Sequence, residues 1–312
     1  MKHDFKIVVL LVTFYLLAQI IGLGIVYNDI KVERAVTQAG QIIIIISHPE
    51  TALGPRPDVY NFDAIVLVLI SVLIGTGLIL LVVRFNSINI WKGFFFFAVF
   101  FSITIAVGVF FNWYVAAVIG FILAIVKMWK HNILIHNVTE VLIYSGIAVL
   151  FAPLFEPLWV IVLLLIISVY DAFAVWKSKH MIKMAEFQIE SEAFAGLSIP
   201  YKSKSSLSFK KKGYSTQRNS LQNKKQKTKT TQAILGGGDI AFPLIFAASV
   251  MESLIKTGLI GPAIFFKALF IPIITAIVLL LLMVFGKRGR YYPAMPFLTA
   301  ACLAGYGLVL LL

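Results

Sequence analysis

The chain has 312 residues, of which 60% are hydrophobic and 13% are charged, and its formal net charge is +13. Soluble domains contain about a quarter charged residues, so this composition and a mean hydropathy of +0.94 exclude a mostly solvated surface. The single cysteine, Cys302, excludes an intramolecular disulfide framework and a cysteine-based metal cluster.

Apolar runs of about 20 residues recur along the chain, and this length matches the hydrocarbon thickness of a bilayer. A transmembrane β-barrel would instead show short alternating segments, which the sequence lacks. We therefore predict an all-α polytopic membrane protein. Its nine transmembrane helices are predicted at Phe5–Tyr27, Asp63–Val83, Gly93–Phe111, Trp113–Trp129, Asn137–Phe155, Leu158–Trp176, Ala233–Ile255, Gly261–Phe285 and Tyr291–Leu312.

Two features of the first 62 residues concern the topology. The first apolar run follows Lys2 and Lys6 but is longer than a typical signal-peptide core and lacks a small-residue cleavage site. We therefore predict a retained first span. The isoleucine-rich run Gln41–Ile46 is too short to cross a bilayer and is predicted to lie in the first loop.

The distribution of cations predicts the orientation of these spans. The connections after the second, fourth, sixth and eighth spans are basic, whereas the first loop is rich in acidic residues and Glu156 follows the fifth span. Because cytoplasmic loops carry an excess of Lys and Arg, the N-terminus is predicted to be cytoplasmic and the C-terminus to lie outside.

The longest connection, 177–235, is the main polar segment. It contains thirteen lysines and arginines against three acidic residues, and so carries most of the net charge. Its middle is too poor in apolar residues to fold by itself, whereas Met181, Met184, Ala185 and Ile189 suggest an interfacial amphipathic helix. Aromatic residues for base stacking are sparse, so we predict a basic cytoplasmic loop near anionic lipid and no nucleic-acid partner.

Most acidic residues near the spans have structural explanations. Asp63, Glu140 and Glu156 lie at predicted span ends, and Glu252 can pair with Lys256 one helical turn later. Ionisable groups inside a span are costly and indicate function by default, and two aspartates remain after this sorting.

Asp171 and Asp239 are predicted to lie at the same depth in the membrane. Asp171 lies six residues before Lys177 at the end of the sixth span, and Asp239 lies six residues after Ala233 at the start of the seventh. Both distances correspond to roughly 9 Å at ~1.5 Å per residue. Because the two spans are antiparallel, both carboxyls enter from the cytoplasmic face.

A pair of carboxyls at this depth suits hydrolysis of an amide bond. Two close carboxyls cannot both ionise cheaply, so one stays protonated while the other is charged. One can then accept a proton from the attacking water while the other donates to the carbonyl oxygen, which requires no metal or other cofactor. The glycines before Asp239 allow close approach of the backbone, and Pro243 frees backbone groups that a water-filled cavity can satisfy.

A third group of residues begins the ninth span on the same side. Pro293-Ala294-Met295-Pro296 contains two prolines, which favour either an extended segment leading into the helix or an ordinary helix start.

These three pieces together resemble the motifs of a known family. Tyr170-Asp171, Gly236-Gly237-Gly238-Asp239 and Pro293-Ala294-Met295-Pro296 are similar to the YD, GxGD and PAL motifs of the presenilin and signal peptide peptidase family. The order of the motifs in spans six, seven and nine also agrees. Lys179-His180-Met181 is most similar to archaeal homologues, whereas Met295 stands where the family usually has leucine, a change that conserves volume.

The resemblance implies a single intramembrane aspartyl protease domain over residues 1–312. It comprises six spans in 1–176, the loop 177–235 and three spans in 236–312. Asp171 and Asp239 would be catalytic, while Tyr170, Gly236, Gly238 and the segment Pro293–Met295 would shape the site and place the substrate. Substrates would be transmembrane segments or remnant signal peptides. The resemblance to archaeal homologues further implies a multi-pass protein of an archaeal plasma membrane that acts without other subunits; the oligomeric state is left open.

Other chemistries and classes fit the sequence less well. There is no His-Glu-x-x-His helix for a zinc protease, and His48, His131 and His136 are predicted to be solvated or interfacial. An ion- or proton-coupled transporter would also use paired intramembrane acids, but near mid-membrane and with an inverted repeat. A non-catalytic scaffold leaves the aspartates unexplained.

Overall fold

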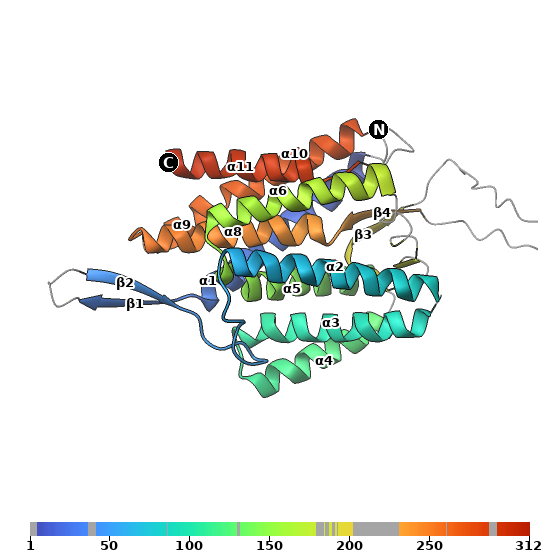
Figure 1. Cartoon of the computed structure of the whole chain (residues 1–312), viewed down its shortest axis with the longest axis horizontal. Helices are drawn as coiled ribbons and strands as arrows, with labels where there is room; N and C mark the ends of the chain where they lie inside the picture. Colours follow the sequence, from blue (N-terminus) through green and yellow to red (C-terminus); the bar gives the residue numbers. More distant parts are fainter. Residues whose placement is uncertain are drawn as a thin grey trace, which may run out of the picture.

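The computed structural model describes residues 5–36, 42–85, 87–129, 132–178, 184, 187–188, 191, 193–201, 231–259, 261–286 and 292–312. Most of them form helices that run side by side along the long axis of the molecule, with a β-hairpin at each end (Figure 1). The predictions for Lys179-His180-Met181, for most of the amphipathic helix and for the middle of the basic loop concern residues outside those described.

The helices follow the predicted order of apolar segments. They are α1 (Phe5–Asp29), α2 (Phe62–Arg84), α3 (Ile88–Gly108), α4 (Trp113–Trp129), α5 (Ile133–Phe151), α6 (Pro157–Phe173), α8 (Gly238–Lys256), α9 (Pro262–Ala268), α10 (Phe270–Phe285) and α11 (Met295–Leu311). A 3₁₀ turn (Ala152–Leu154) follows α5, and a π-helical turn (Ala174–Ser178) extends α6.

Seven helical stretches among the described residues are long and apolar enough to cross a membrane, and α9 and α10 together form one of them. Two apolar helices, α4 and α11, are shorter, with 17 residues each. The chain is therefore a polytopic helical membrane protein, as its composition predicted.

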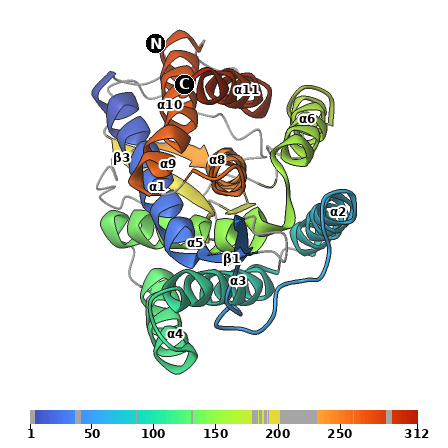
Figure 2. The same cartoon turned by 90° about the vertical axis from the view of Figure 1, so that its left-hand side faces the viewer.

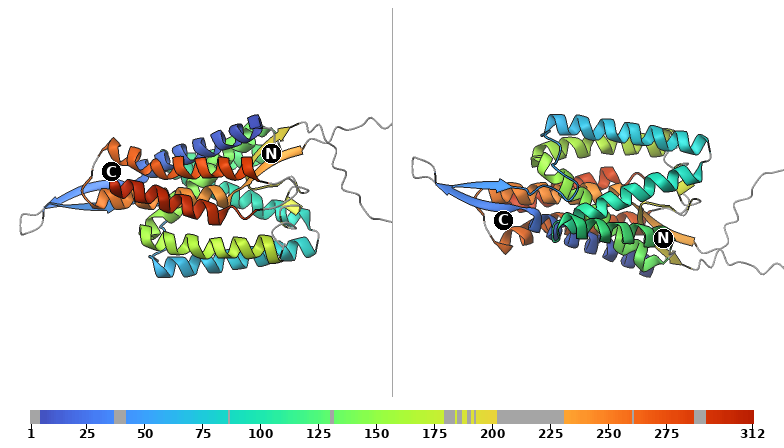
Figure 3. Two further views of the ribbon diagram at one scale, coloured as in Figure 1. Left: turned by 90° about the horizontal axis from the view of Figure 1, so that it is seen from above. Right: turned by 90° about the horizontal axis from the view of Figure 1, so that it is seen from below.

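The helices differ in how deeply they lie in the bundle. Of the 18 residues in the apolar stretch of α8, 72% are buried inside the protein, against 11% in the corresponding stretch of α2. End-on, α8 lies near the centre of the molecule and α2 at its margin (Figure 2). Seen from above and below, α2 runs beside α6 along one outer edge (Figure 3). The apolar side chains of α2 consequently face lipid along most of the helix.

Two antiparallel hairpins were not predicted. Strands β1 (Lys31–Val36) and β2 (Ile42–Ser47) pair beyond the C-terminal end of α1, and β2 contains the isoleucine run expected in a loop. Strands β3 (Gly196–Tyr201) and β4 (Thr231–Gly236) pair at the opposite end, with Gly196 opposite Gly236. Both hairpins contain β-branched residues, which favour strands. The pairing of β3 with β4 joins two parts of the basic segment that are about 30 residues apart in the chain.

The hairpin β3–β4 also corrects the start of the seventh span. The apolar residues from Ala233 were expected to be helical, but they belong to β4, and α8 begins only at Gly238. Each glycine lowers helix propensity by about 1 kcal/mol, so the run Gly236–Gly238 delays the helix, which begins only at the last of the three glycines. The hairpin lies at the end of the bundle where α1 begins, whereas α11 ends at the other (Figure 1).

Candidate active site

Asp171 lies in the last turn of α6 and is buried, with 5% of its surface exposed. Its Oδ2 atom accepts a hydrogen bond of 3.1 Å from the backbone N–H of Met295. Because the first N–H groups of a helix lack intrahelical partners, the start of α11 offers this donor without losing a helical bond. The carboxyl group of α6 is therefore oriented by α11.

The segment Pro293–Pro296 brings this donor to Asp171. Pro293 and Met295 are buried, Ala294 is half-buried, and Pro296 occupies the first turn of α11. The segment is thus a helix start, one of the two structures that its prolines favoured.

A hydrogen bond between side chains joins α6 and α11 about one turn further along. Ser168 Oγ and Thr299 Oγ1 are 2.7 Å apart, and both residues are buried. Buried polar contacts of this kind hold transmembrane helices in register, so Asp171 and Met295 N keep their alignment. The only signal for this pair in the sequence was that both are polar residues in apolar spans.

Asp239 lies in the first turn of α8 and is half-buried. The preceding Gly237 is in close contact with Tyr144 of α5, because a Cβ atom added there would lie 2.8 Å from Tyr144 Oη. Glycine at this position is therefore required by packing rather than by an unusual backbone angle. Pro243 is buried within α8 and leaves the carbonyl of Asp239 without its usual helical donor.

The structure brings the two predicted aspartates together. Asp171 and Asp239 lie on α6 and α8, which pack against each other, and Tyr144 of α5 contacts Gly237, two residues before Asp239. One carboxyl stands in the last turn of α6 and the other in the first turn of α8, at the end of the bundle that carries β3 and β4. This placement near one end differs from the mid-membrane site expected of a transporter.

The remaining predicted site residues lie around this pair. Tyr170 Oη is 3.4 Å from Thr76 Oγ1 on α2, so this side chain connects α6 to the marginal helix. Gly236 ends β4 and lies next to the carboxyl group of Asp239, while Gly238 is exposed at the first position of α8.

Sequence reasoning missed a contribution from α1. Gln19 is fully buried in the middle of this apolar helix, and its Nε2 atom donates a 2.8 Å hydrogen bond to the carbonyl of Ile240, next to Asp239. Nearby, Tyr15 Oη donates to Thr275 Oγ1 of α10 at 2.9 Å. A buried amide in an apolar span was the available signal, but its partner could not be identified from the sequence.

Three other polar residues have partners that the sequence did not suggest. Glu140, expected at a span end, is fully buried and lies 2.6 Å from Lys127 Nζ. His136, expected to be solvated or interfacial, is half-buried and contacts both Lys127 and Gly196. His48, expected to be solvated or interfacial, is 3.2 Å from Asp29 and 3.6 Å from Glu252, for which only Lys256 had been considered.

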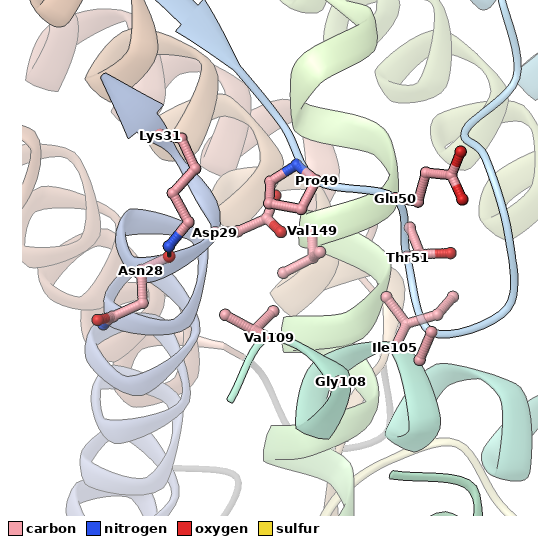
Figure 4. Close-up of a pocket in the computed structure, with 11 residues that line it drawn as sticks. Asn28, Asp29, Lys31, Pro49, Glu50, Thr51, Ile105, Gly108, Val109 and Val149 are labelled. Atoms are coloured by element: carbon pink, nitrogen blue, oxygen red, sulfur yellow. Dashed lines mark hydrogen bonds between the residues drawn. The ribbon is translucent and has the colours of Figure 1, made fainter. Parts of the chain in front are cut away.

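A cavity of about 40 Å³ lies at the other end of the bundle, far along α1 from the aspartates. Asn28 and Asp29 at the end of α1, Thr51 of the first loop and Gly108 of α3 line it (Figure 4). Its volume suffices for only a few water molecules. This cavity therefore belongs to the packing of the first loop rather than to the site of the aspartates.

Comparisons with known proteins agree with the motifs. The sequence model described as "Signal-peptide peptidase, presenilin aspartyl protease" matches residues 9–312. Two solved structures of a presenilin family intramembrane aspartate protease, in space groups C222 and P2, resemble the fold, each with a TM-score of 0.55. The first is 20% identical and aligned over 97% of this chain and 98% of the other, and the second is 18% identical over 96% of each. No curated protein matches the chain.

Proposed function

Because the chain belongs to the signal-peptide-peptidase and presenilin family of aspartyl proteases, it is an intramembrane aspartyl protease, and we propose that Asp171 and Asp239 are its catalytic pair. One observation supports the assignment: α6 and α8 pack against each other and carry these two carboxyls at the same end of the helical bundle. Ordinary structural acids are not paired in this way, because two like charges in a weakly polar site repel strongly.

The proposed mechanism uses a single shared proton. One carboxyl is ionised and accepts a proton from water as the oxygen attacks the carbonyl carbon of the peptide bond. Its protonated partner donates to the carbonyl oxygen, which gives a tetrahedral diol. Collapse of the diol breaks the C–N bond, and a proton passes to the leaving amine, so the pair can act again.

The neighbouring motif residues support this role through geometry. The N–H of Met295 fixes the orientation of the Asp171 carboxyl, and we propose that Pro293 and Ala294 place the substrate beside it. Gly236 and Gly238 keep the approach to Asp239 free of side chains, while Tyr170 holds α6 against α2. Holding the catalytic groups and the substrate in the correct geometry can lower the activation barrier by several kcal/mol.

We further propose nine membrane crossings in a single protease domain. The seven long apolar stretches together with α4 and α11 give this number. The positive-inside rule then predicts a cytoplasmic N-terminus, a cytoplasmic loop 177–235 and an external C-terminus, and the resemblance to archaeal homologues favours an archaeal plasma membrane. Substrates are transmembrane helices that reach the site through the bilayer, and the enzyme acts without other subunits.

The test is cleavage of a single-span peptide by purified protein in detergent. Asp171→Asn and Asp239→Asn each keep the size of the side chain, and each should reduce the cleavage rate by about 1,000-fold or more. Asp58→Asn, at an exposed position in the first loop, is the matched control and should cleave normally.

Two further readouts belong to the same experiment. A transition-state analogue of aspartyl proteases should inhibit the parent enzyme, and the products should be cut near the cytoplasmic end of the substrate span. Cleavage that survives either Asp→Asn change would show that the pair has been assigned wrongly.

A further inference from the structure

A buried polar cluster lies next to the candidate active site, where α4, α5 and β3 meet. Lys127 of α4 and Glu140 of α5 form an ion pair of 2.6 Å, and their side chains are 2% and 0% exposed. Moving two charges out of water costs several kcal/mol per ion, so a buried pair contributes little stability unless other hydrogen bonds complete it. An arrangement this costly inside a membrane protein indicates a function beyond stability.

The hydrogen bonds of Lys127 are complete. Besides Glu140, its ammonium group lies 3.2 Å from Thr139 Oγ1 and 3.3 Å from His136 Nδ1. His136 Nε2 is 2.8 Å from the carbonyl of Gly196, and since a carbonyl can only accept, Nε2 carries the ring proton. Nδ1 then accepts from Lys127, and the imidazole links the ammonium group to the backbone of β3.

Glu140 and Asn137 bind the same strand. Glu140 Oε2 accepts from the backbone N–H of Gly196 at 3.0 Å and from the hydroxyl of Tyr144. One turn earlier, the amide of Asn137 donates to the carbonyl of Ser198 and accepts from its N–H, both at 3.1 Å. Side chains of α5 therefore bind both backbone groups, the N–H and the carbonyl, of Gly196 and of Ser198, which alternate along one edge of β3.

Two short connections lead from this cluster to Asp239. In the hairpin, Gly196 pairs with Gly236, and α8 begins two residues later with Asp239 in its first turn. The ring of Tyr144 also packs directly on Gly237. Gly196 itself has a φ of +149° and lies close to the carbonyl of Leu235, so a side chain there would disturb the pairing.

We propose that Lys127, Glu140 and Tyr144 form a positioning network that fixes the hairpin β3–β4 and the start of α8, and thereby holds the Asp239 carboxyl opposite Asp171. The network does not touch substrate. It acts through the backbone of Gly196 and Gly237, and the inference rests on the catalytic role proposed for Asp239. Displacement of a catalytic group by about 1 Å can lower a rate by a factor of 100, so its loss should be visible in turnover.

The sharpest test is Tyr144→Phe, which removes one hydroxyl and keeps the ring against Gly237. We expect kcat for a single-span substrate to fall at least about tenfold with KM unchanged, and the melting temperature to stay close to that of the parent. Tyr306→Phe is the matched control, since Tyr306 lies on α11 near the opposite end and packs on Phe246. It should leave kcat unchanged.

A double-mutant cycle tests the charges. Glu140→Gln places an amide donor against the ammonium group, and Lys127→Met leaves a buried carboxylate without its cation, so each should lower kcat. The combination Lys127→Met with Glu140→Gln removes both charges and keeps an oxygen that accepts from Gly196 N–H. Its kcat should be closer to the parent value than that of either single variant.

The outcomes separate the two proposals. If Asp239→Asn abolishes cleavage and Tyr144→Phe leaves kcat intact, the positioning network is refuted and the catalytic pair stands. A lower melting temperature with unchanged kcat in the charge variants, or a change confined to KM, would refute it too. If Asp239→Asn still cleaves, the catalytic assignment itself fails.

Discussion

The ionic cluster at the end of the bundle where α1 ends shows how single residues hold the first loop against the helices. Arg56 Nη2 lies 2.6 Å from Asp29 Oδ2, and His48 lies between Asp29 and Glu252. Burial lowers the pKa of His48, but the hydrogen bonds from its ring to Asp29 and Glu252 outweigh this and raise the pKa to about 9. His48 is therefore an imidazolium at neutral pH.

This raised pKa predicts a stability that depends on pH. The contribution of His48 is complete below its unfolded pKa of about 6.5 and is lost as the pH rises through about 9. His48→Gln should thus lower the melting temperature at pH 6, by an amount equivalent to at most about 3 kcal/mol, and have little effect at pH 10. Lys31→Gln, which removes an exposed cation nearby, is the control for net charge. Equal effects of His48→Gln at both pH values would contradict the assignment.

Single polar residues can be identified from the sequence, but their partners in the fold cannot. Asp171 and Asp239 could be predicted because an aspartate within an apolar run has no ordinary explanation. The partners of Glu140 and Glu252 could not, because Lys127 and His48 come from other elements, whose contacts depend on the packing of the whole bundle.

At the scale of elements, glycines set the distance between helices. Gly305 of α11 packs against the backbone of Ile271 in α10, and an added Cβ atom would lie 2.8 Å from Ile271 Cα. Small residues at such contacts allow transmembrane helices to approach closely. Gly307, two residues later on α11, has open space around it.

These two glycines form a matched pair for mutagenesis. Gly305→Ala should force α10 and α11 apart and lower stability by about 1–3 kcal/mol, whereas Gly307→Ala should be neutral or slightly stabilising because alanine favours helix. Thermal unfolding in detergent measures both. The same loss in both variants would show that backbone freedom, and not the helix contact, determines the result.

Elements were predicted unequally well, for a physical reason. Long apolar runs of span length identify helices directly, so even α3 and α4, joined by four residues, were separated correctly. The strands are six residues each and carry no alternating pattern strong enough to distinguish them from loop or helix. The strand β4 was therefore merged with the span that follows it.

The topology of the whole molecule can be tested by labelling. In a Cys302→Ala background, which removes a buried thiol, cysteine is introduced by Val32→Cys in β1 or by Lys177→Cys after α6, both at exposed positions. A membrane-impermeant maleimide should label the first in intact cells and the second only after the membrane is permeabilised. The reverse pattern would invert the proposed orientation.

The short helix α11 has a consequence for the membrane around the enzyme. Its 17 residues extend about 26 Å at ~1.5 Å per residue, less than the hydrocarbon core of about 30 Å. Such hydrophobic mismatch is relieved by thinning of the adjacent lipid. Because the first N–H of α11 binds Asp171, the thinned bilayer brings the aqueous headgroup region toward the carboxyl that we propose to be catalytic. The acyl-chain length of the surrounding lipids thus becomes a variable of peptide hydrolysis.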